Sequence, residues 1–216
     1  MIRTASIRQK FKVLHHMKRF APNGTLEIRG ASFEADEQSI FGTPNPEYIA
    51  AEIQWYEEQS LSVDRLAEIY GKRVAIWDAV ANDSGLINSN YGWCIYNREN
   101  GSQYKSCLHE LKADPASRRG IMIYTDPDMH VIARSSGIND FICTNAVHYH
   151  IQDNQVHAVV QMRSNDAVYG YNNDIAWQRH VLSKLANDLE LEVGSITWQA
   201  ASLHVYPRHF KLIEEI

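Results

Sequence analysis

The hydrophobic pattern of the chain changes its period near the middle. In the first half, apolar residues recur at helical spacing, interrupted by one alternating segment with Leu26 and Ile28 that follows an Asn-Gly turn and predicts a strand. The predicted helices cover residues 6–20, a segment that starts at Asn45, and residues 63–70, 74–81 and 103–112. The start signal at Asn45 is strong, because Asn45 can cap the helix and Pro46 suits its first position.

The second half predicts strands and one long helix. Three segments, G-I-M-I-Y-T, D-F-I-C-T-N-A-V-H-Y-H-I and Q-V-H-A-V-V-Q-M-R-S, have strand composition, and Asp153-Asn154 predicts a tight turn between the last two. A helix is expected from about Asn173 to Leu189, followed by a final strand, S-I-T-W-Q-A-A-S-L-H-V-Y, and a closing helix, H-F-K-L-I-E-E-I. Strands and helices do not alternate strictly, so the pattern favours a single α+β domain over residues 1–216 with a large sheet.

Length and composition are those of a soluble globular protein. The 216 residues are 44% hydrophobic and 22% charged. No apolar run reaches the roughly 20 residues of a membrane helix, and no signal-peptide stretch opens the chain, so a cytoplasmic location is expected. A net charge of -5 argues against a general nucleic-acid surface. Three scattered cysteines, Cys94, Cys107 and Cys143, argue against a disulfide framework or a C-x-x-C zinc site, which leaves a cytosolic enzyme or a binding domain.

Two residues in apolar surroundings could carry chemistry. Cys143 falls inside a predicted strand, where a buried structural cysteine is the plainer interpretation; a thiolate nucleophile would need a positive charge nearby, which Arg163 could supply. Glu52 falls on the apolar stripe that Ile49, Ile53 and Tyr56 define in the Asn45 helix. Burial would raise the pKa of this carboxyl group toward the range useful for acid–base catalysis, whereas a position at the stripe's edge would let it reach water. Both interpretations of Glu52 remain open.

Other polar residues lie where strands end or helices begin. Arg118 and Arg119 precede a strand, and Arg163-Ser164 ends one ahead of a helix; guanidinium groups in such places suit phosphate but can also be merely solvated. Asp174 is expected in the first turn of the long helix, where the helix dipole alone would explain an acidic residue.

Histidines occur in two strand patterns. His204 and Tyr206 share one face of the last strand and could hydrogen-bond a sugar. His148 and His150 form an H-x-H pair, but the spacing places no third ligand, so we predict no metal site.

The order of these residues resembles the thymidylate synthase superfamily and, within it, the phage deoxycytidylate (dCMP) hydroxymethylases. The resemblance covers nearly the whole chain. It rests on G-A-S-F-E-A-D-E-Q-S-I-F-G, E-I-Q-W-Y, I-W-D, N-S-N-Y-G-W, D-P-A-S-R-R-G-I-M-I-Y-T, D-F-I-C-T-N, M-R-S-N-D-A-V-Y-G-Y-N-N-D-I-A-W-Q and S-L-H-V-Y-P-R-H-F. It implies a large mixed sheet flanked by helices, with one sheet face used to form a homodimer.

The resemblance also implies a role for each candidate residue. Cys143 matches the family's nucleophile and Glu52 its catalytic glutamate. The matched nucleotide ligands are Arg163 and Ser164 for the phosphate, Arg118 and Arg119 for the phosphate of the neighbouring subunit, His204 and Tyr206 for the sugar hydroxyl, and Asn145. The matched ligands of the co-substrate 5,10-methylenetetrahydrofolate are Asp166, Trp77 and Tyr91.

Asp174 stands where synthases that act on uracil carry asparagine. Cytosine presents an amino donor and a bare ring nitrogen, so an amide would meet donor with donor, at a cost of roughly 1–3 kcal/mol for each unpaired group. A carboxyl group can accept from the amino group and share a proton with the ring nitrogen. Val80 replaces a bulky tryptophan of the family's W-D-x-W motif, which would admit water. The expected product is therefore 5-hydroxymethyl-dCMP.

Three alternatives remain open at this point. They are a CMP 5-hydroxymethylase of nucleoside antibiotic biosynthesis, a thymidylate synthase acting on dUMP, and a catalytically silent nucleotide-binding homologue. Asp174 disfavours dUMP, and the presence of both Cys143 and Glu52 disfavours a silent homologue. His204 and Tyr206 do not decide whether a 2′-hydroxyl group fits.

Overall fold

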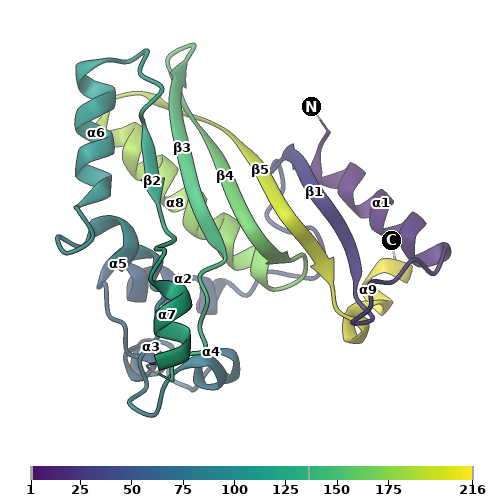
Figure 1. The fold of residues 1–216 in the computed structure, drawn as a ribbon. Helices are drawn as coiled ribbons and strands as arrows, with labels where there is room; N and C mark the ends of the chain where they lie inside the picture. The colour runs from purple at the N-terminus through teal and green to yellow at the C-terminus, as the bar shows by residue number, and fades with distance from the viewer. Residues whose placement is uncertain (1, 136, 216) are drawn as a thin grey trace. The chain divides into compact units, whose positions relative to one another are not determined.

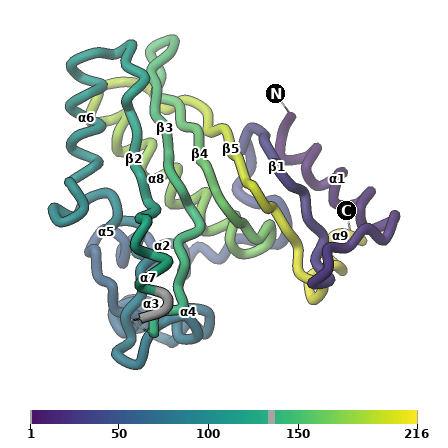
Figure 2. The backbone as a smooth tube through the Cα atoms, viewed as in Figure 1, coloured from purple at the N-terminus to yellow at the C-terminus, as the bar shows by residue number. Residues whose placement is uncertain are grey.

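The computed structural model describes residues 2–135 and 137–215, which form two compact units. The first unit combines the chain up to Pro44 with the part from Val147 onward, and the second is residues 45–146. The chain leaves the first unit after Pro44 and returns to it at Val147. Figure 2 traces the backbone from the N-terminus to the C-terminus. The expectation of one domain stays a prediction, and each unit is described by itself.

Long strands form the framework of the first unit (Figure 1). They are β1 (Leu26–Glu34), β3 (Thr144–Gln152), β4 (Gln155–Asp166) and β5 (Glu192–Val205). β5 pairs antiparallel with β1 and parallel with β4, and the order in the sheet is β1-β5-β4-β3-β2, with β2 at Ile121–Ile123. The predicted hairpin turn is confirmed, since Asp153 and Asn154 have φ of 52° and 61°, as a type I′ turn requires. The mixed sheet agrees with the expected α+β class.

Helices complete the first unit. They are α1 (Thr4–His16), α8 (Gly170–Asp188), the 3-10 turn Pro207–His209 and α9 (Lys211–Glu214). α8 contacts β4 and β5 and buries Ile175, Leu182 and Leu185, as the helical spacing predicts. Alternate residues of β4, such as Ala158 and Val160, are buried, while the residues between them are half-exposed. The sheet therefore has one buried face and one face that is only partly covered.

The second unit is mostly helical. Its elements are α2 (Pro46–Glu57), α3 (Val63–Tyr70), α4 (Ala75–Val80), α5 (Tyr91–Tyr96), α6 (Gln103–Ala113), β2 and α7 (Met129–Ser135). The side chain of Asn45 accepts a hydrogen bond from Tyr48 N at 3.2 Å, which confirms the predicted cap. The buried face of α2 differs in part from the prediction: Tyr56 is buried as expected, together with Glu52 and Trp55, whereas Ile49 and Ile53 are only half-buried. None of the described helices is long and apolar enough to cross a membrane.

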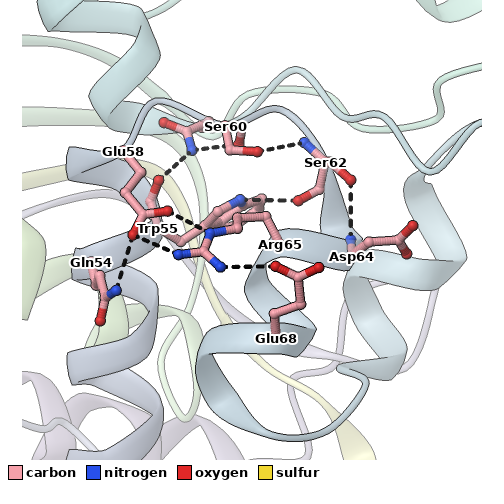
Figure 3. Close-up of polar contacts among 9 residues, drawn as sticks. Gln54, Trp55, Glu58, Ser60, Ser62, Asp64, Arg65 and Glu68 are labelled. Carbon is pink, nitrogen blue, oxygen red and sulfur yellow. Dashed lines mark hydrogen bonds and ion pairs between the residues drawn. The ribbon is translucent and has the colours of Figure 1, made fainter.

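The junction between α2 and α3 is held by polar contacts (Figure 3). Ser62 caps α3 through its side chain, and its carbonyl oxygen accepts a hydrogen bond from Trp55 Nε1 at 3.1 Å. The guanidinium group of Arg65 lies between two carboxylates, with Nε 2.6 Å from Glu58 Oε2 and Nη1 2.8 Å from Glu68 Oε2. The hydrogen bond from Arg65 is the main reason why the pKa of Glu58 falls to about 2.

The segment N-S-N-Y-G-W is fixed against α2. A Cβ atom at Gly92 would lie 1.7 Å from the carbonyl oxygen of Tyr56, so no side chain fits there. The side chain of Asn90 accepts from Trp93 N at 2.8 Å and donates to the carbonyl oxygens of Trp55 and Ser60 at 3.1 and 2.8 Å. These contacts fix the start of α5 and, with it, the position of the predicted site residue Tyr91.

Candidate active site

Glu52 is a buried carboxyl group inside the second unit. It is 5% exposed, and its Oε1 accepts a hydrogen bond of 2.5 Å from the hydroxyl group of Tyr48. That hydroxyl in turn accepts from Trp77 Nε1 at 2.9 Å. Burial raises the pKa of Glu52 to about 7 against the opposing effect of these hydrogen bonds. The structure thus selects the buried interpretation of Glu52, with a protonation equilibrium near neutral pH.

Aromatic rings surround this carboxyl group and include two predicted folate ligands. The Trp77 ring lies edge-on to Trp55 with centroids 5.3 Å apart, and the Tyr91 ring lies 5.3 Å from that of Tyr56. A side-chain hydrogen bond with Tyr56 also lowers the pKa of Glu52, against the effect of burial. Three of the predicted residues, Glu52, Trp77 and Tyr91, therefore belong to one cluster. Sequence reasoning missed Tyr48, although its place one helical turn before Glu52 was a usable signal.

Cys143 precedes β3 instead of lying inside it, because the strand begins only at Thr144; the expected strand position was wrong. Its Sγ lies 3.8 Å from the carbonyl oxygen of Phe141. Cys143 is half-buried, whereas Cys94 and Cys107 are 1% and 2% exposed. Burial raises the pKa of both of these thiols to about 12, which makes them inert at neutral pH. Cys143 is therefore the accessible thiol of the three.

Asp140 fixes the segment that carries Cys143, and sequence reasoning missed it. Its buried carboxylate accepts from the backbone N–H groups of Asn88 and Ser89 at 2.9 and 2.6 Å and from Ser89 Oγ at 2.7 Å. Asn88 Nδ2 also donates to the carbonyl oxygen of Asp140 at 3.1 Å. These bonds join the cysteine segment to N-S-N-Y-G-W. An aspartate inside an apolar segment was the available signal.

The remaining candidates of the second unit lie near β2. Arg118 and Arg119 are exposed, and the guanidinium group of Arg119 bonds to Glu110 Oε1 from both Nε and Nη2 at 2.9 Å. Ser117 donates to the same oxygen at 2.5 Å and is the main reason why the pKa of Glu110 is lowered. The backbone oxygen of Asn145 accepts from Tyr124 N at 2.9 Å, so β2 and the start of β3 are held together.

The other candidates gather in the first unit at the carboxyl ends of two parallel strands. Arg163, Ser164 and Asp166 occupy the end of β4, and Asp166 lies opposite His204 on β5. α8 begins at Gly170, shortly after this edge of the sheet. The amino end of a helix and a strand end that bears an arginine are suited to an anionic ligand. From the sequence, only Arg163 and Ser164 were predicted to lie at a strand end close to the start of a helix.

Asp174 lies in the second turn of α8, because the helix begins at Gly170 and not near Asn173. The expected first-turn position, and with it the helix-dipole explanation of this residue, was wrong, since that effect fades beyond the first turn. Asp174 Oδ2 instead accepts a hydrogen bond from Asn165 Nδ2 at 2.7 Å. A contact with β4 thus accounts for the position of this carboxyl group.

The last candidates surround this edge. Asp166 accepts backbone hydrogen bonds from Val168 N at 3.1 Å and Tyr169 N at 3.4 Å, which turn the chain toward α8. The rings of His204 and Tyr206 are perpendicular with centroids 5.0 Å apart, although Tyr206 follows β5 instead of belonging to it.

The H-x-H pair remains without a third ligand. His150 stacks on His157 with centroids 5.2 Å apart. Within residues 2–135 and 137–215, no group of three or more His, Cys, Asp or Glu side chains could hold a metal ion.

Comparison with known proteins gives the family. A family model described as thymidylate synthase matches residues 43–216. The chain belongs to the thymidylate synthase family. Deoxycytidylate 5-hydroxymethyltransferase of Enterobacteria phage T4 is 51% identical over 197 residues, which cover 88% of this chain and 79% of that protein. The thymidylate synthase of Francisella philomiragia is 25% identical over 209 residues, covering 89% of this chain and 74% of that one. The family resemblance inferred from sequence blocks is thereby confirmed.

A solved structure confirms the fold of this thymidylate synthase family member. The thermostable thymidylate synthase A from Bacillus subtilis superposes with a TM-score of 0.69 at 24% sequence identity. The match covers 88% of this chain and 70% of that chain. The predicted mixed sheet flanked by helices is therefore the family's fold.

Proposed function

We propose that this member of the thymidylate synthase family is a deoxycytidylate 5-hydroxymethyltransferase. It would convert dCMP, 5,10-methylenetetrahydrofolate and water into 5-hydroxymethyl-dCMP and tetrahydrofolate. The 51% identity with the phage T4 enzyme of that name supports the reaction. The carboxyl group of Asp174, beside the arginine-bearing end of β4, is the observation that carries the choice of base.

The base specificity follows from hydrogen-bond chemistry. Asp174 can accept from the exocyclic amino group of cytosine and share a proton with the ring nitrogen next to it. Uracil presents a carbonyl oxygen in place of the amino group, so it would set acceptor against acceptor. Leaving such a buried group unpaired costs about 1–3 kcal/mol, or roughly a 5- to 150-fold preference for cytosine.

The residues proposed to bind the nucleotide's phosphate and sugar lie at the same edge of the first unit. Arg163 and Ser164 would bind the phosphate, and His204 and Tyr206 would bind the sugar hydroxyl. Asn145 would contact the nucleotide from the start of β3. Arg118 and Arg119 are exposed and would reach the phosphate bound by a second subunit.

Covalent catalysis would begin when Cys143 Sγ forms a bond to ring carbon 6 of cytosine, which makes carbon 5 nucleophilic. Methylenetetrahydrofolate supplies the one-carbon unit at carbon 5. Carbon 5 would then lose its proton as the bond from the transferred carbon to the folate nitrogen breaks, so that tetrahydrofolate leaves and an exocyclic methylene group remains. Water would add to that methylene group, and the bond to Cys143 would break. Glu52 would carry protons during these steps, since its pKa of about 7 allows it both to accept and to donate at neutral pH.

The residues predicted for folate fit a flat heterocycle with N–H donors. Trp77 and Tyr91 offer aromatic faces and edges, for which stacking on an extended ring is favourable. Each carboxylate oxygen of Asp166 accepts one backbone N–H and retains a further lone pair for a ligand's donor.

The proposed enzyme is a cytoplasmic homodimer. The partly covered face of the sheet, with half-exposed residues such as Gln161 and Gln199, is the surface through which two copies would pair. The exposure of Arg118 and Arg119 supports their assignment to a neighbouring subunit's site. Each site would then be complete only in the dimer.

The decisive experiment offers dCMP, CMP and dUMP separately with methylenetetrahydrofolate and identifies the products by mass. We expect a hydroxymethylated product from dCMP in preference to the other two. Preference for CMP would mean that the enzyme acts on the ribonucleotide and not on the deoxyribonucleotide. A methylated product formed together with dihydrofolate would mean that the enzyme is a synthase. If carbon 5 hydrogen is not released from any of the three nucleotides, the chain is a binding homologue and the proposal fails.

A further inference from the structure

Asn165 is a buried amide in direct contact with the proposed base-reading carboxyl group. It is 3% exposed, and its Nδ2 donates to Asp174 Oδ2 at 2.7 Å. Its Oδ1 is buried and has no hydrogen-bond partner among the residues that the structure describes. A buried polar atom of this kind is costly unless a ligand or water completes it.

The turn into α8 leaves just enough room for this pair. A Cβ atom at Gly170 would lie 3.3 Å from Asn165 Nδ2 and 3.7 Å from Asp174 Oδ2. The first of these distances is tighter than an ordinary carbon–nitrogen contact, so a side chain at this position would press on the amide. The backbone of α8 therefore packs closely against the Asn165–Asp174 hydrogen bond.

We propose that Asn165 is a positioning residue that sets which oxygen of Asp174 accepts from the base, and thereby contributes to the discrimination of cytosine from uracil. The proposal rests on the hydroxymethyltransferase function proposed above. It concerns Asn165, which holds Asp174 in place. The contact between Asp174 itself and the base belongs to the proposed function.

The amide group of Asn165 fixes the roles of the two carboxyl oxygens. Asn165 Nδ2 can only donate, so Asp174 Oδ2 is an acceptor; because the unprotonated oxygen of a carboxyl group is the better acceptor, this bond favours a proton on Oδ1 over one on Oδ2. Oδ2 has a second lone pair for the amino group of cytosine, while the proton on Oδ1 can be shared with the ring nitrogen. Uracil would need the reverse arrangement, with a proton opposite its carbonyl oxygen.

Asn165 Oδ1, which is buried without a hydrogen-bond partner among the described residues, also favours cytosine over uracil. Asn165 Oδ1 is an acceptor on the side chain that holds Asp174, and an amino group carries two N–H donors. The pair thus has two acceptor oxygens, Asp174 Oδ2 and Asn165 Oδ1, for the two N–H donors of an amino group, and a carbonyl group offers no such donors. Loss of the Asn165 side chain would remove the donor that now makes Asp174 Oδ2 an acceptor.

Two substitutions test the proposal by the ratio of kcat/KM for dCMP to that for dUMP, measured as release of the carbon 5 hydrogen with methylenetetrahydrofolate. Asn165→Ala removes the donor, and we expect the ratio to fall by about 10- to 100-fold, as for the loss of a hydrogen bond to a charged group. Asn172→Ala is the matched control, since Asn172 is also 3% exposed and donates to the carbonyl oxygen of Phe41 at 3.3 Å. We expect its ratio to equal that of the wild type.

Asn165→Asp keeps the shape of the side chain and tests the position of the proton. Two carboxyl groups can stay in contact only while they share a proton, so we expect activity on dCMP to decline at a lower pH than in the wild type. Thermal melting of each variant establishes that it is folded. Should Asn165→Ala fail to fold, the pH profile of Asn165→Asp decides the question.

The outcomes separate the two proposals. A wild-type protein that releases no hydrogen from dCMP overturns the proposed function. An active wild type whose folded Asn165 variants keep the wild-type ratio within twofold, or whose Asn165→Asp variant keeps the wild-type pH profile, overturns the role of Asn165 alone.

Discussion

Glu52 should make the stability of the protein depend on pH, and Glu52→Gln should remove that dependence. Burial raises the pKa of the folded-state carboxyl group from 4.5 to about 7. The native state therefore holds a proton that the unfolded chain releases, and the stability that this proton contributes is lost as pH rises through 7. Glutamine has nearly the same shape and does not titrate, so the variant should gain stability relative to wild type as pH rises.

The size of the effect follows from the pKa values of Glu52 in the folded and unfolded states. A tenfold difference between the two acid dissociation constants corresponds to about 1.4 kcal/mol, so the full penalty above pH 7 is on the order of 3 kcal/mol. Between pH 5 and pH 8 the difference in the free energy of unfolding between Glu52→Gln and wild type should grow by about 2.5 kcal/mol. Urea unfolding, followed by tryptophan fluorescence at a single protein concentration, measures this difference.

The matched control is Glu58→Gln at the end of the same helix. The pKa of Glu58 is lowered to about 2, chiefly by its hydrogen bond from Arg65 (Figure 3). Glu58 stabilises the fold above the unfolded-state pKa, and that contribution is lost as pH falls toward 2, so this substitution should destabilise the protein at neutral pH. A Glu52→Gln difference that stays constant from pH 5 to pH 8 would refute the assignment of a buried, proton-holding Glu52.

Three further outcomes follow from the geometry. A thiol reagent at pH 8 should label Cys143 and spare Cys94 and Cys107 in the folded protein, as peptide mass mapping would show; labelling of all three at equal rates would contradict their difference in burial. Arg119→Ala and Cys143→Ser should each be inactive alone, and mixing the two proteins should restore a fraction of the hydrogen-release activity if arginines are shared between subunits; no recovery in mixed dimers argues against sharing. Asp140→Asn should destabilise the protein by roughly 2–4 kcal/mol, because an amide cannot accept all three bonds that the carboxylate accepts; a melting temperature equal to that of wild type would contradict this.

The sequence predicted local structure correctly where a few neighbouring residues determine it. The Asn45 cap and the Asp153-Asn154 turn depend on residues adjacent in the chain, and both were found where expected. α5 and α7 were missed; in α5, Gly92 at the second helical position is a poor helix former and weakens the sequence signal. The long helix began at Gly170 instead of near Asn173, since tertiary contacts override the poor helix propensity of glycine.

The candidate site was predictable in its residue types and not in its contacts. Asp174 was recognised from its type, but its hydrogen bond with Asn165 depends on the approach of α8 to the end of β4. The bonds between Asp140 and Ser89 likewise join segments that are distant in sequence. The helix pattern allowed either a buried Glu52 or a Glu52 that reaches water at the edge of the apolar stripe. The tertiary packing shows that it is buried.

The pairing of β1 with β5 has a consequence for how the protein is made. Leu26 pairs with Val205, so β1 has no strand partner until the whole stretch of chain between it and β5 has been synthesised. Until then, both edges of β1 lack a strand partner and its apolar side chains lack their cover, a state that favours aggregation. Contacts between such distant segments also slow folding. Synthesis of this protein should therefore depend on chaperones more strongly than its modest size implies, and a ribosome stalled before β5 should release a chain that cannot fold its first unit.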